Sequence, residues 1–295
     1  MTLPRVTVVT PSFNQAAFLE TTILSVLGQC YPNLEYLVMD GGSNDGSREI
    51  IERYQDKLAY WQSRSDGGQS AALNAAFARA TGDIFCWINS DDFLLPGTLH
   101  HVARLFAEKV VEPQLAYGSC LFFHDRGKRA KVVRARAHDP WLLRISGYII
   151  QPSAFWTRAL WDKTGQLDQS LSFAFDWDWF IRASSQGKFT SCDQIWSAYR
   201  FHEAHKSSSG SERRRNEIID VARRHADAQQ VAAYEFVDRH WEKIEERRSL
   251  GEAMRRRGIP GAQLLARCAV PLRDAVPAGV TPEDLRLCEN MLRGS

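Results

Sequence analysis

Residues 5–14, RVTVVTPSFN, decide the fold class. Residues 6–10 form a β-branched run, which is typical of a strand buried on both faces of a sheet. The run stops at Pro11, and Ser12 and Asn14 are residues that favour turns. We therefore predict a buried strand that ends in a polar loop.

The same unit of strand and helix repeats along the chain after this run. Further strands are predicted over residues 34–40 (LEYLVMD), 58–62 and 84–89 (IFCWIN). Between them, apolar residues recur at helical spacing: Leu19, Ile23, Val26 and Leu27; Ile50, Ile51 and Tyr54; Leu73, Ala76, Phe77 and Ala80. Alternation of this kind predicts an α/β, Rossmann-like fold with a mainly parallel sheet flanked by helices.

Polar or glycine-rich sequence follows each predicted strand. These segments are residues 11–14, 40–46, 66–69 and 89–92. Right-handed crossovers place the carboxyl ends of parallel strands at one edge of the sheet, and ligands bind at that edge in open sheets. We therefore expect the four segments to converge on one site.

The alternation changes after Pro113. LAYGSCLFF (115–123) and KVVRAR (131–136) flank a turn-forming stretch and predict a hairpin, so the sheet should gain some antiparallel strands. Beyond Gly210 the sequence is rich in Arg, Glu and Ala and predicts helices, interrupted at residues 258–261 and by Pro271, Pro277 and Pro282.

The composition excludes several classes of protein. Hydrophobic residues make up 44% of the 295 residues and charged residues 24%, as in ordinary globular chains. A net charge of +2 gives no reason to expect a nucleic-acid partner. The six cysteines lack the close pairs of zinc or redox motifs, so we expect reduced thiols. With neither a signal-like segment nor an apolar run of about 20 residues, the expected location is cytoplasmic.

Basic residues gather in the last third of the chain, at residues 213–215, 223–224, 247–248 and 255–257. Three readings stay open. The arginines form a solvated or packed helix face, they bind a partner subunit, or they make peripheral contact with an anionic membrane at its inner face.

Two acidic clusters carry the candidate chemistry. Asp91 and Asp92 follow an apolar strand, where a hard cation such as Mn²⁺ or Mg²⁺ would relieve the repulsion of adjacent carboxylates, although helix capping also explains the pair. Asp176 and Asp178 lie in the aromatic stretch FDWDWFIR. Partial desolvation there would suit a general base, and again capping is the simpler alternative.

Seven segments in order resemble the inverting, family-two glycosyltransferases of GT-A fold, of the bacterial polysaccharide-biosynthesis type. They are VTPSFNQ, MDGGSNDGS, DGGQSAALNAAFARATGD, WINSDD, QPSAFW, FDWDWFIR and YRFHEAHKSSS, and together they cover residues 4–210. The resemblance implies a GT-A catalytic domain over residues 1–210, with the nucleotide sugar bound by residues 1–110 and the acceptor by residues 111–210. Residues 211–295 lie outside it and form the predicted helical C-terminal extension.

The resemblance implies residue roles on the donor side. Matched residue by residue, the family's nucleotide-sugar contacts fall on Pro11, Ser12, Asp40, Asp66, Gln69, Asn74, Asp91 and Lys206. Asp40 matches the carboxylate that recognises the base or ribose. Asp66 and Gln69 match the loop that closes over the nucleoside.

The metal, the base and the acceptor are assigned in the same way. The segment from Asn89 to Asp92 matches the DXD-type metal motif with Asn in its first position, so the metal ligands implied are Asp91, Asp92 and the late histidine His202. Asp176 matches the catalytic base, although Phe175 stands where the family has Glu. The acceptor residues expected are Gln151 together with Trp177 and Trp179, on which a sugar ring could stack.

The expected activity is transfer of a sugar from a nucleoside diphosphate donor, a UDP-sugar by preference, to an acceptor hydroxyl. The acceptor would be a saccharide or a lipid-linked saccharide of a cell-surface polysaccharide or glycolipid. Two alternatives stay open: a sugar nucleotidyltransferase, and a non-catalytic nucleotide-sugar binder that retains the fold.

Overall fold

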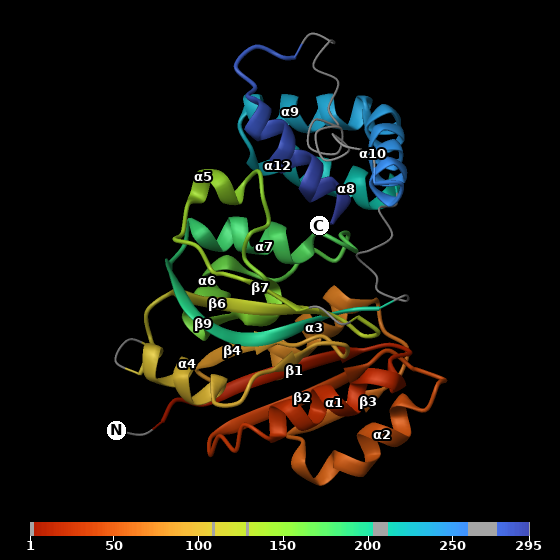
Figure 1. Ribbon diagram of the computed structural model, residues 1–295. Helices are drawn as coiled ribbons and strands as arrows, with labels where there is room; N and C mark the ends of the chain where they lie inside the picture. Colours follow the sequence, from red (N-terminus) through yellow and green to blue (C-terminus); the bar gives the residue numbers. More distant parts are fainter. Residues whose placement is uncertain (1–2, 108–109, 128–129, 203–211, 259–275, 295) are drawn as a thin grey trace. The chain divides into compact units, whose positions relative to one another are not determined.

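The computed structural model describes residues 3–107, 110–127, 130–202, 212–258 and 276–294, which form two compact units (Figure 1). The first unit takes in residues 1–143 and 148–205, and the second takes in residues 144–147 and 206–295. The predicted division after residue 210 falls in the segment 203–211, outside the described residues.

The described strands of the first unit form one nine-stranded sheet in the order β3-β2-β1-β4-β8-β6-β9-β5, with β7 paired to β6. Strands β1 to β4 are parallel, β8 is antiparallel to β4 and β6, and β6 and β9 are parallel. Their bounds are β1 Val6–Ser12, β2 Leu34–Asp40, β3 Tyr60–Ser63, β4 Ile84–Trp87, β5 Phe93–Leu94, β6 Gln114–His124, β7 Ala130–Val133, β8 Ala154–Thr157 and β9 Lys188–Phe201. The predicted mainly parallel sheet with some antiparallel strands is confirmed.

The predicted strands and hairpin lie close to their expected positions. Every residue of β1 and β4 is buried, which explains why both read as continuous apolar or β-branched runs. The hairpin predicted from residues 115–123 and 131–136 is the antiparallel pair β6 and β7. β6 is also longer than predicted at both ends, because it pairs with β9 along its whole length.

Helices cover both faces of the sheet (Figure 1). On one face, Leu19 and Ile23 of α1 and Val102 of α4 share a core with Cys86 and Phe155 of the sheet. On the other face, Trp156 of the sheet contacts aromatic side chains of three helices, Phe77 of α3, Trp161 of α6 and Trp179 of α7. The helix bounds are α1 Ala16–Leu27, α2 Ser47–Tyr54, α3 Gln69–Arg79, α4 Thr98–Phe106, α5 Pro140–Leu143, α6 Arg158–Thr164 and α7 Phe175–Ser184.

The second unit is helical, as predicted for the C-terminal extension. Its described helices are α8 Glu212–His225, α9 Ala228–Arg239, α10 Trp241–Arg256 and α12 Pro282–Arg293. Pro282 does not interrupt a helix but begins one: it follows the cap residue Thr281, whose hydroxyl accepts the Asp284 N–H. Asp227 caps α9 in the same way through Gln230.

Several arginines of the basic clusters are paired within this unit. Arg214 donates to the last carbonyls of α12, and Arg215 and Arg223 pair with Asp238 and Glu235. Arg248 binds Glu289. These pairings agree with the reading of a packed helix face. None of the helices that the structure describes is both long and apolar enough to cross a membrane.

The Glu35 carboxylate ties three segments together at the amino edge of the sheet. It accepts hydrogen bonds from the Thr7 hydroxyl at 2.5 Å and from the Thr81 hydroxyl and N–H at 2.6 and 2.7 Å, and it pairs with Arg5. Burial alone would raise the pKa of Glu35, but these hydrogen bonds and the arginine charge outweigh it and lower the pKa below its ordinary value.

We expect Glu35→Gln to lower the free energy of unfolding at neutral pH by about 2 kcal/mol, because buried donors lose a charged acceptor. Since the folded pKa is lowered, this contribution is present above the unfolded pKa and is lost as pH falls through the folded pKa. Denaturant unfolding of both proteins from pH 7 to pH 3 should therefore show a difference that shrinks with acid. Glu52→Gln, at a surface pair with Arg48, should change little. A Glu35→Gln effect that is constant or larger in acid contradicts the assignment.

Candidate active site

The loops after β1 and β2 are hydrogen-bonded to each other at the carboxyl edge of the sheet. Ser12 pairs with Asp40 in the strand register, and the Gly41 N–H donates to the Ser12 carbonyl at 2.9 Å. Beyond the strands, the Asn14 N–H donates to the Ser43 hydroxyl at 2.7 Å. The structure thus brings together the first two predicted loop segments.

The Asp40 carboxylate lies inside the loop that it was predicted to offer to a ligand. It is fully buried and accepts hydrogen bonds from the Gly42 and Ser43 N–H groups and from the Ser43 and Ser63 hydroxyls. Gly42 has a φ of +84°, and a Cβ there would lie 2.9 Å from the Ser65 nitrogen, so this turn requires glycine. Asp40 shapes the loop, and its contact with the base or ribose stays a prediction.

An exposed aromatic ring lies beside this loop. The side chain of Phe13 is 61% exposed. A Cβ on Gly41 would lie 3.3 Å from the Phe13 ring and 3.4 Å from both carboxylate oxygens of Asp66. Phe13 and Asp66 therefore flank the same point of backbone, where glycine leaves room. Phe13 is not among the predicted site residues, although an aromatic residue inside the polar loop PSFN is a signal that could have identified it.

Pro11 and Ser12, both predicted donor contacts, are buried at the end of β1. The Ser12 hydroxyl oxygen is buried and has no hydrogen-bond partner among the described residues. Buried hydroxyls are usually paired, so an unpaired one at this edge is a feature that a bound ligand could explain. Lys206, another predicted donor contact, lies outside the described residues.

A row of three amides joins the third loop to the fourth. The Gln69 Nε2 group, at the start of α3, donates to Asn89 Oδ1 at 2.9 Å. Asn89 Nδ2 donates to Gln151 Oε1 at 3.4 Å, and Gln151 Nε2 donates to the Trp87 carbonyl at 2.7 Å. Asn89 both accepts and donates in this row, which an aspartate could not do. The departure from the DXD pattern at position 89 therefore has a structural reason.

Two residues predicted to contact a ligand also form hydrogen bonds within the protein. Gln151 is buried, and its amide binds Asn89 and the Trp87 carbonyl. Asn74 is also buried, and its amide makes two hydrogen bonds to the backbone of Leu167, at 2.9 and 3.0 Å, which join α3 to the loop before α7. The acceptor contact of Gln151 and the donor contact of Asn74 stay predictions.

Asp91 and His202 form a close pair from segments far apart in the sequence. Asp91 Oδ2 lies 3.1 Å from His202 Nε2, and the two side chains are 15% and 5% exposed. The His202 ring packs against Phe18 of α1 with a centroid separation of 4.4 Å. The structure thus brings together two of the three predicted metal ligands.

Asp92, the third predicted ligand, lies apart from this pair in its contacts. It is buried, and its Oδ1 accepts the Arg200 N–H at 3.0 Å, whereas its Oδ2 has no hydrogen-bond partner within the described part of the chain. Burial raises the pKa of Asp92 well above its ordinary value, and the neighbouring charge of Asp91 raises it further. In the part of the chain that the structure describes, no three His, Cys, Asp or Glu side chains are grouped to hold a metal ion. The structure thus pairs Asp91 with His202, and metal binding by Asp91, Asp92 and His202 stays a prediction.

Arg200 holds the end of β9 against the fourth loop, a role that the sequence analysis missed. Its Nε donates to the Asp91 carbonyl at 3.0 Å, and its Nη1 binds Asp125 at 2.7 Å. The guanidinium also lies over the rings of Phe18 and Phe123 at 4.9 and 5.1 Å. These contacts fix the backbone two residues before His202.

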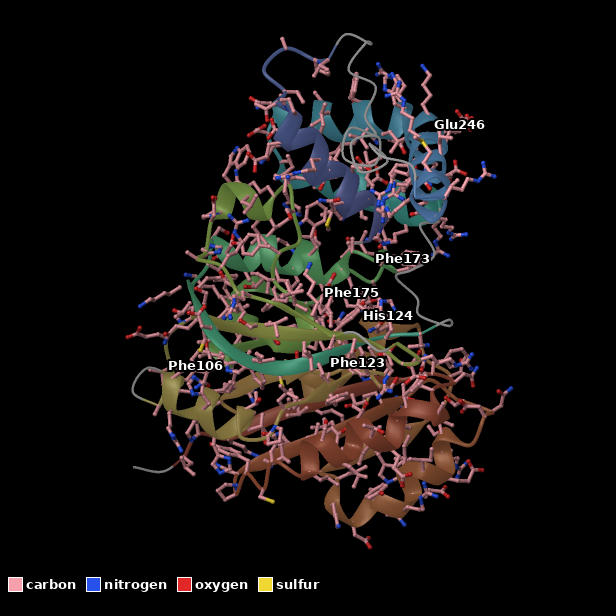
Figure 2. The ribbon with its side chains drawn as sticks, viewed as in Figure 1. Phe106, Phe123, His124, Phe173, Phe175 and Glu246 are labelled. Atoms are coloured by element: carbon pink, nitrogen blue, oxygen red, sulfur yellow. The ribbon has the colours of Figure 1, made fainter. Side chains whose placement is uncertain are left out.

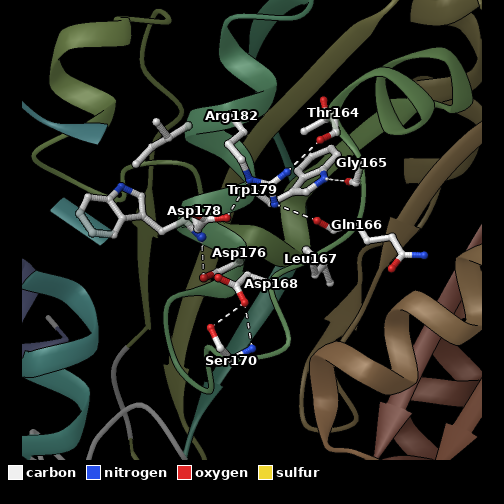
Figure 3. A network of polar contacts seen from close by, with 12 residues as sticks. Thr164, Gly165, Gln166, Leu167, Asp168, Ser170, Asp176, Asp178, Trp179 and Arg182 are labelled. Atoms are coloured by element: carbon white, nitrogen blue, oxygen red, sulfur yellow. Dashed lines mark hydrogen bonds and ion pairs between the residues drawn. The ribbon is translucent and has the colours of Figure 1, made fainter. Parts of the chain in front are cut away.

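The two aspartates of FDWDWFIR have different environments (Figure 3). Asp176 is half-buried in the first turn of α7, and its Oδ1 accepts the Trp177 N–H at 2.8 Å. Asp178 is buried and binds Arg182 at 2.8 Å, and Arg182 in turn donates to the Thr164 carbonyl. Asp178 is thus part of the packing of α7, whereas Asp176 remains a candidate for chemistry.

Trp177 and Trp179 are core residues. Trp177 is 3% exposed and donates to the Leu143 carbonyl, and Trp179 is fully buried and donates to the Gly165 carbonyl. The Trp179 ring packs against Trp156 at a centroid separation of 4.9 Å. Both side chains are therefore part of the packing of α7, and their stacking on an acceptor sugar stays a prediction.

Residues 7–159 match the profile described as Glycosyl transferase family 2, and the match covers more than half of the chain. The chain belongs to this family. Curated relatives include an uncharacterized glycosyltransferase of Mycobacterium tuberculosis, 32% identical over 187 residues, which make up 61% of this chain and 69% of that protein. An uncharacterized glycosyltransferase of Rickettsia typhi is 27% identical over 192 residues, and this family-2 chain spans 60% of its length.

Solved structures share the fold. The mannosyltransferase PcManGT from Pyrobaculum calidifontis, solved with GDP-Man and Mn²⁺, has a TM-score of 0.63 at 18% identity over 100% of this chain and 86% of its own. Residues 1–349 of S. aureus TarS, in complex with UDP-GlcNAc, have a TM-score of 0.59 at 20% identity over 99% of this chain and 92% of their own. The predicted GT-A fold is confirmed.

We expect Asn89→Asp to weaken the site even though it restores the DXD pattern of the family. The carboxylate would lose the donor to Gln151 Oε1 and would add negative charge near Asp91 and the buried Asp92. The free energy of unfolding should fall by about 1–2 kcal/mol, as measured by denaturant unfolding.

Asn33→Asp is the matched control, because Asn33 donates to a single carbonyl at an exposed position. We expect a change within about 0.5 kcal/mol for it. If the Asn89→Asp variant is as stable as the wild type, or more stable, the amide row does not stabilise the contact between the third and fourth loops.

Proposed function

We propose that this chain is an inverting glycosyltransferase that moves a sugar from a nucleoside diphosphate donor to an acceptor hydroxyl. The observation that carries the proposal is the Asp91–His202 pair, held at 3.1 Å at the end of the parallel strands. The exposed ring of Phe13 and the carboxylate of Asp66 belong to loops at the same edge. This edge thus offers a surface for a base and a carboxylate–imidazole pair for a diphosphate.

The donor that these residues suit best is a UDP-sugar. The open face of Phe13 can stack on a base, and the Asp66 carboxylate can accept the N–H of a uracil. Asp66 is itself held by the Gly68 N–H, which donates to its Oδ1 at 2.8 Å. The Ser12 hydroxyl supplies a further hydrogen-bonding group next to this surface.

The residues present fit a divalent metal ion that is shared with the donor. Asp91 offers carboxylate oxygen and His202 offers imidazole nitrogen, a combination that suits Mn²⁺, and substrate phosphate oxygens commonly complete such sites. PcManGT, which shares the fold, was solved with Mn²⁺. When bound, the ion would supply charge neutralisation for the departing diphosphate.

Asp176 is the proposed general base. The N-terminal turn of α7 favours a negative charge at this position, and the Trp177 N–H holds one carboxylate oxygen in place. Asp176 takes the proton of the acceptor hydroxyl while the hydroxyl oxygen attacks the anomeric carbon from the side opposite the diphosphate. A single displacement of this kind inverts the configuration at that carbon. The product would be a lengthened cell-surface saccharide or glycolipid.

A donor panel tests the proposal. We expect nucleoside diphosphate release from one UDP-, GDP- or dTDP-sugar in the presence of Mn²⁺, and loss of release when EDTA removes the metal. His202→Ala should raise the Mn²⁺ concentration for half-maximal release at least about tenfold, because one of two protein ligands is lost. His225→Ala, a half-buried histidine of the second unit, is the control.

The outcome decides between the classes left open by the sequence. Pyrophosphate release from a nucleoside triphosphate and a sugar phosphate would support the nucleotidyltransferase. Donor binding without any turnover would support the non-catalytic binder. Release that does not depend on metal or on His202 would remove the Asp91–His202 pair from the mechanism.

Asp176→Asn tests the base. We expect kcat for transfer to fall by about 10² to 10⁴, since general base catalysis contributes on that order, while donor binding by calorimetry stays unchanged. Asp168→Asn is the matched control: its carboxylate lies in the loop before α7 and accepts the Ser170 N–H and hydroxyl (Figure 3). Full transferase activity in Asp176→Asn would exclude Asp176 as the base.

A further inference from the structure

Four half-buried or exposed rings form a continuous row at the ends of β6 and β9. Phe122 and His124 come from β6, and Tyr199 and Phe201 come from β9. Ring centroids are 5.1 Å apart for Phe122–Tyr199, Tyr199–Phe201 and His124–Phe201, and 5.3 Å apart for Phe122–Phe201. We call these four residues the aromatic row.

The strand register puts the aromatic row on one face of the sheet. Phe122 pairs with Tyr199 and His124 pairs with Phe201, so the four side chains share a face. Arg200 alternates with them and lies over Phe18 of α1, on the opposite face. The aromatic row therefore lies on the face away from α1.

Helix α7 packs on this same face. Its residue Trp179 contacts Trp156, whereas the preceding Phe155 belongs to the core that α1 shares. In Figure 2, Phe173 and Phe175 near the start of α7 lie toward the same end of the sheet as His124, and Phe106 lies at the other end. The aromatic row thus shares its face and its end of the sheet with the proposed base.

The aromatic row also adjoins the proposed metal ligands along the chain. Phe201 directly precedes His202, and Arg200, between the two ring-bearing residues of β9, binds the Asp91 carbonyl. Because Arg200 and His202 both contact Phe18 of α1, the aromatic row and the proposed metal ligands lie at the same end of β9 but on opposite faces of it. A molecule on the row would reach the proposed donor site around this strand end.

Polar groups border the rings. His124 is exposed, and so is Lys131, the cross-strand neighbour of Phe122 on the same face. A sugar ring has apolar C–H faces and a rim of hydroxyls, so it matches aromatic faces with hydrogen-bonding groups at their edge. An alkyl chain has no hydroxyl groups and could not form hydrogen bonds with these polar side chains.

We propose that the aromatic row binds a sugar ring of the acceptor. This inference rests on the proposed function, and it assigns the acceptor contact to Phe122, Tyr199 and Phe201 in place of the buried Trp177 and Trp179. The bound ring stacks on the row, and a hydroxyl group directed toward α7 meets Asp176.

The probes for the test are para-nitrophenyl glycosides of glucose, galactose, mannose and N-acetylglucosamine. Their binding to the full chain is measured without donor by saturation-transfer NMR, and their KM in transfer is measured with the donor found above. We expect Phe122→Ala and the milder Phe122→Leu each to weaken glycoside binding and raise its KM about tenfold, the scale of one lost aromatic contact. Donor hydrolysis without acceptor should not change.

Tyr60→Ala is the matched control, because Tyr60 is a half-buried aromatic residue on β3, at the far edge of the sheet. Thermal unfolding of each variant confirms that it is folded. Unchanged glycoside binding in a folded Phe122 variant overturns the proposal, and so does a wild type that binds octyl chains but no glycoside. If glycoside binding depends on Phe122 but no donor is turned over, the proposal that the aromatic row binds a sugar is supported and the proposed transferase activity is overturned.

Discussion

The buried carboxylate of Asp40 is the interaction on which the candidate site depends. With four hydrogen bonds it holds the Gly42–Ser43 turn and the end of β3 against the end of β2. A buried carboxylate needs donors around it, so these hydrogen bonds stabilise the observed conformation of the loop. That conformation brings Gly41 beside Phe13 and Asp66, and the Ser43 hydroxyl binds the loop after β1. The surface proposed to bind the base therefore depends on the Asp40 carboxylate.

Burial divides the aspartates of the region into two groups. Asp40, Asp92 and Asp178 lie inside the protein and serve its structure through backbone, hydroxyl and arginine donors. Asp66, Asp91 and Asp176 keep some exposure, and we propose that they contact the base, bind the metal ion and accept the proton, respectively. In each of the pairs Asp91–Asp92 and Asp176–Asp178, one member is buried and the other is partly exposed. Sequence alone could name the pairs, because acidic residues at strand and helix ends are visible in it, but not which member is buried.

The sheet could be predicted from the sequence, whereas most contacts of the site could not. Strands β1, β2 and β4 are buried along almost their whole length, and buried strands have a continuous apolar sequence that can be recognised in a single chain. Hydrogen bonds between side chains leave no such pattern. The sequence around a residue does not show which distant residue it will bind. The hydrogen-bonded pairs Asn74–Leu167, Gln151–Asn89 and Trp179–Gly165 each join segments that only the fold brings together. The family resemblance assigned to ligands several side chains that this chain uses in packing, and their ligand contacts stay predictions.

The neutral residue at position 89 follows from the charge around it. Asp92 is buried and carries a raised pKa, to which the charge of Asp91 contributes. A carboxylate at position 89 would add further negative charge beside Asp91 and the buried Asp92. Asn89 avoids that charge and keeps both hydrogen bonds, one to Gln69 and one to Gln151. The amide row thus joins the two loops without adding charge beside the Asp91–His202 pair, where we propose that a metal ion binds together with oxygens of the donor diphosphate.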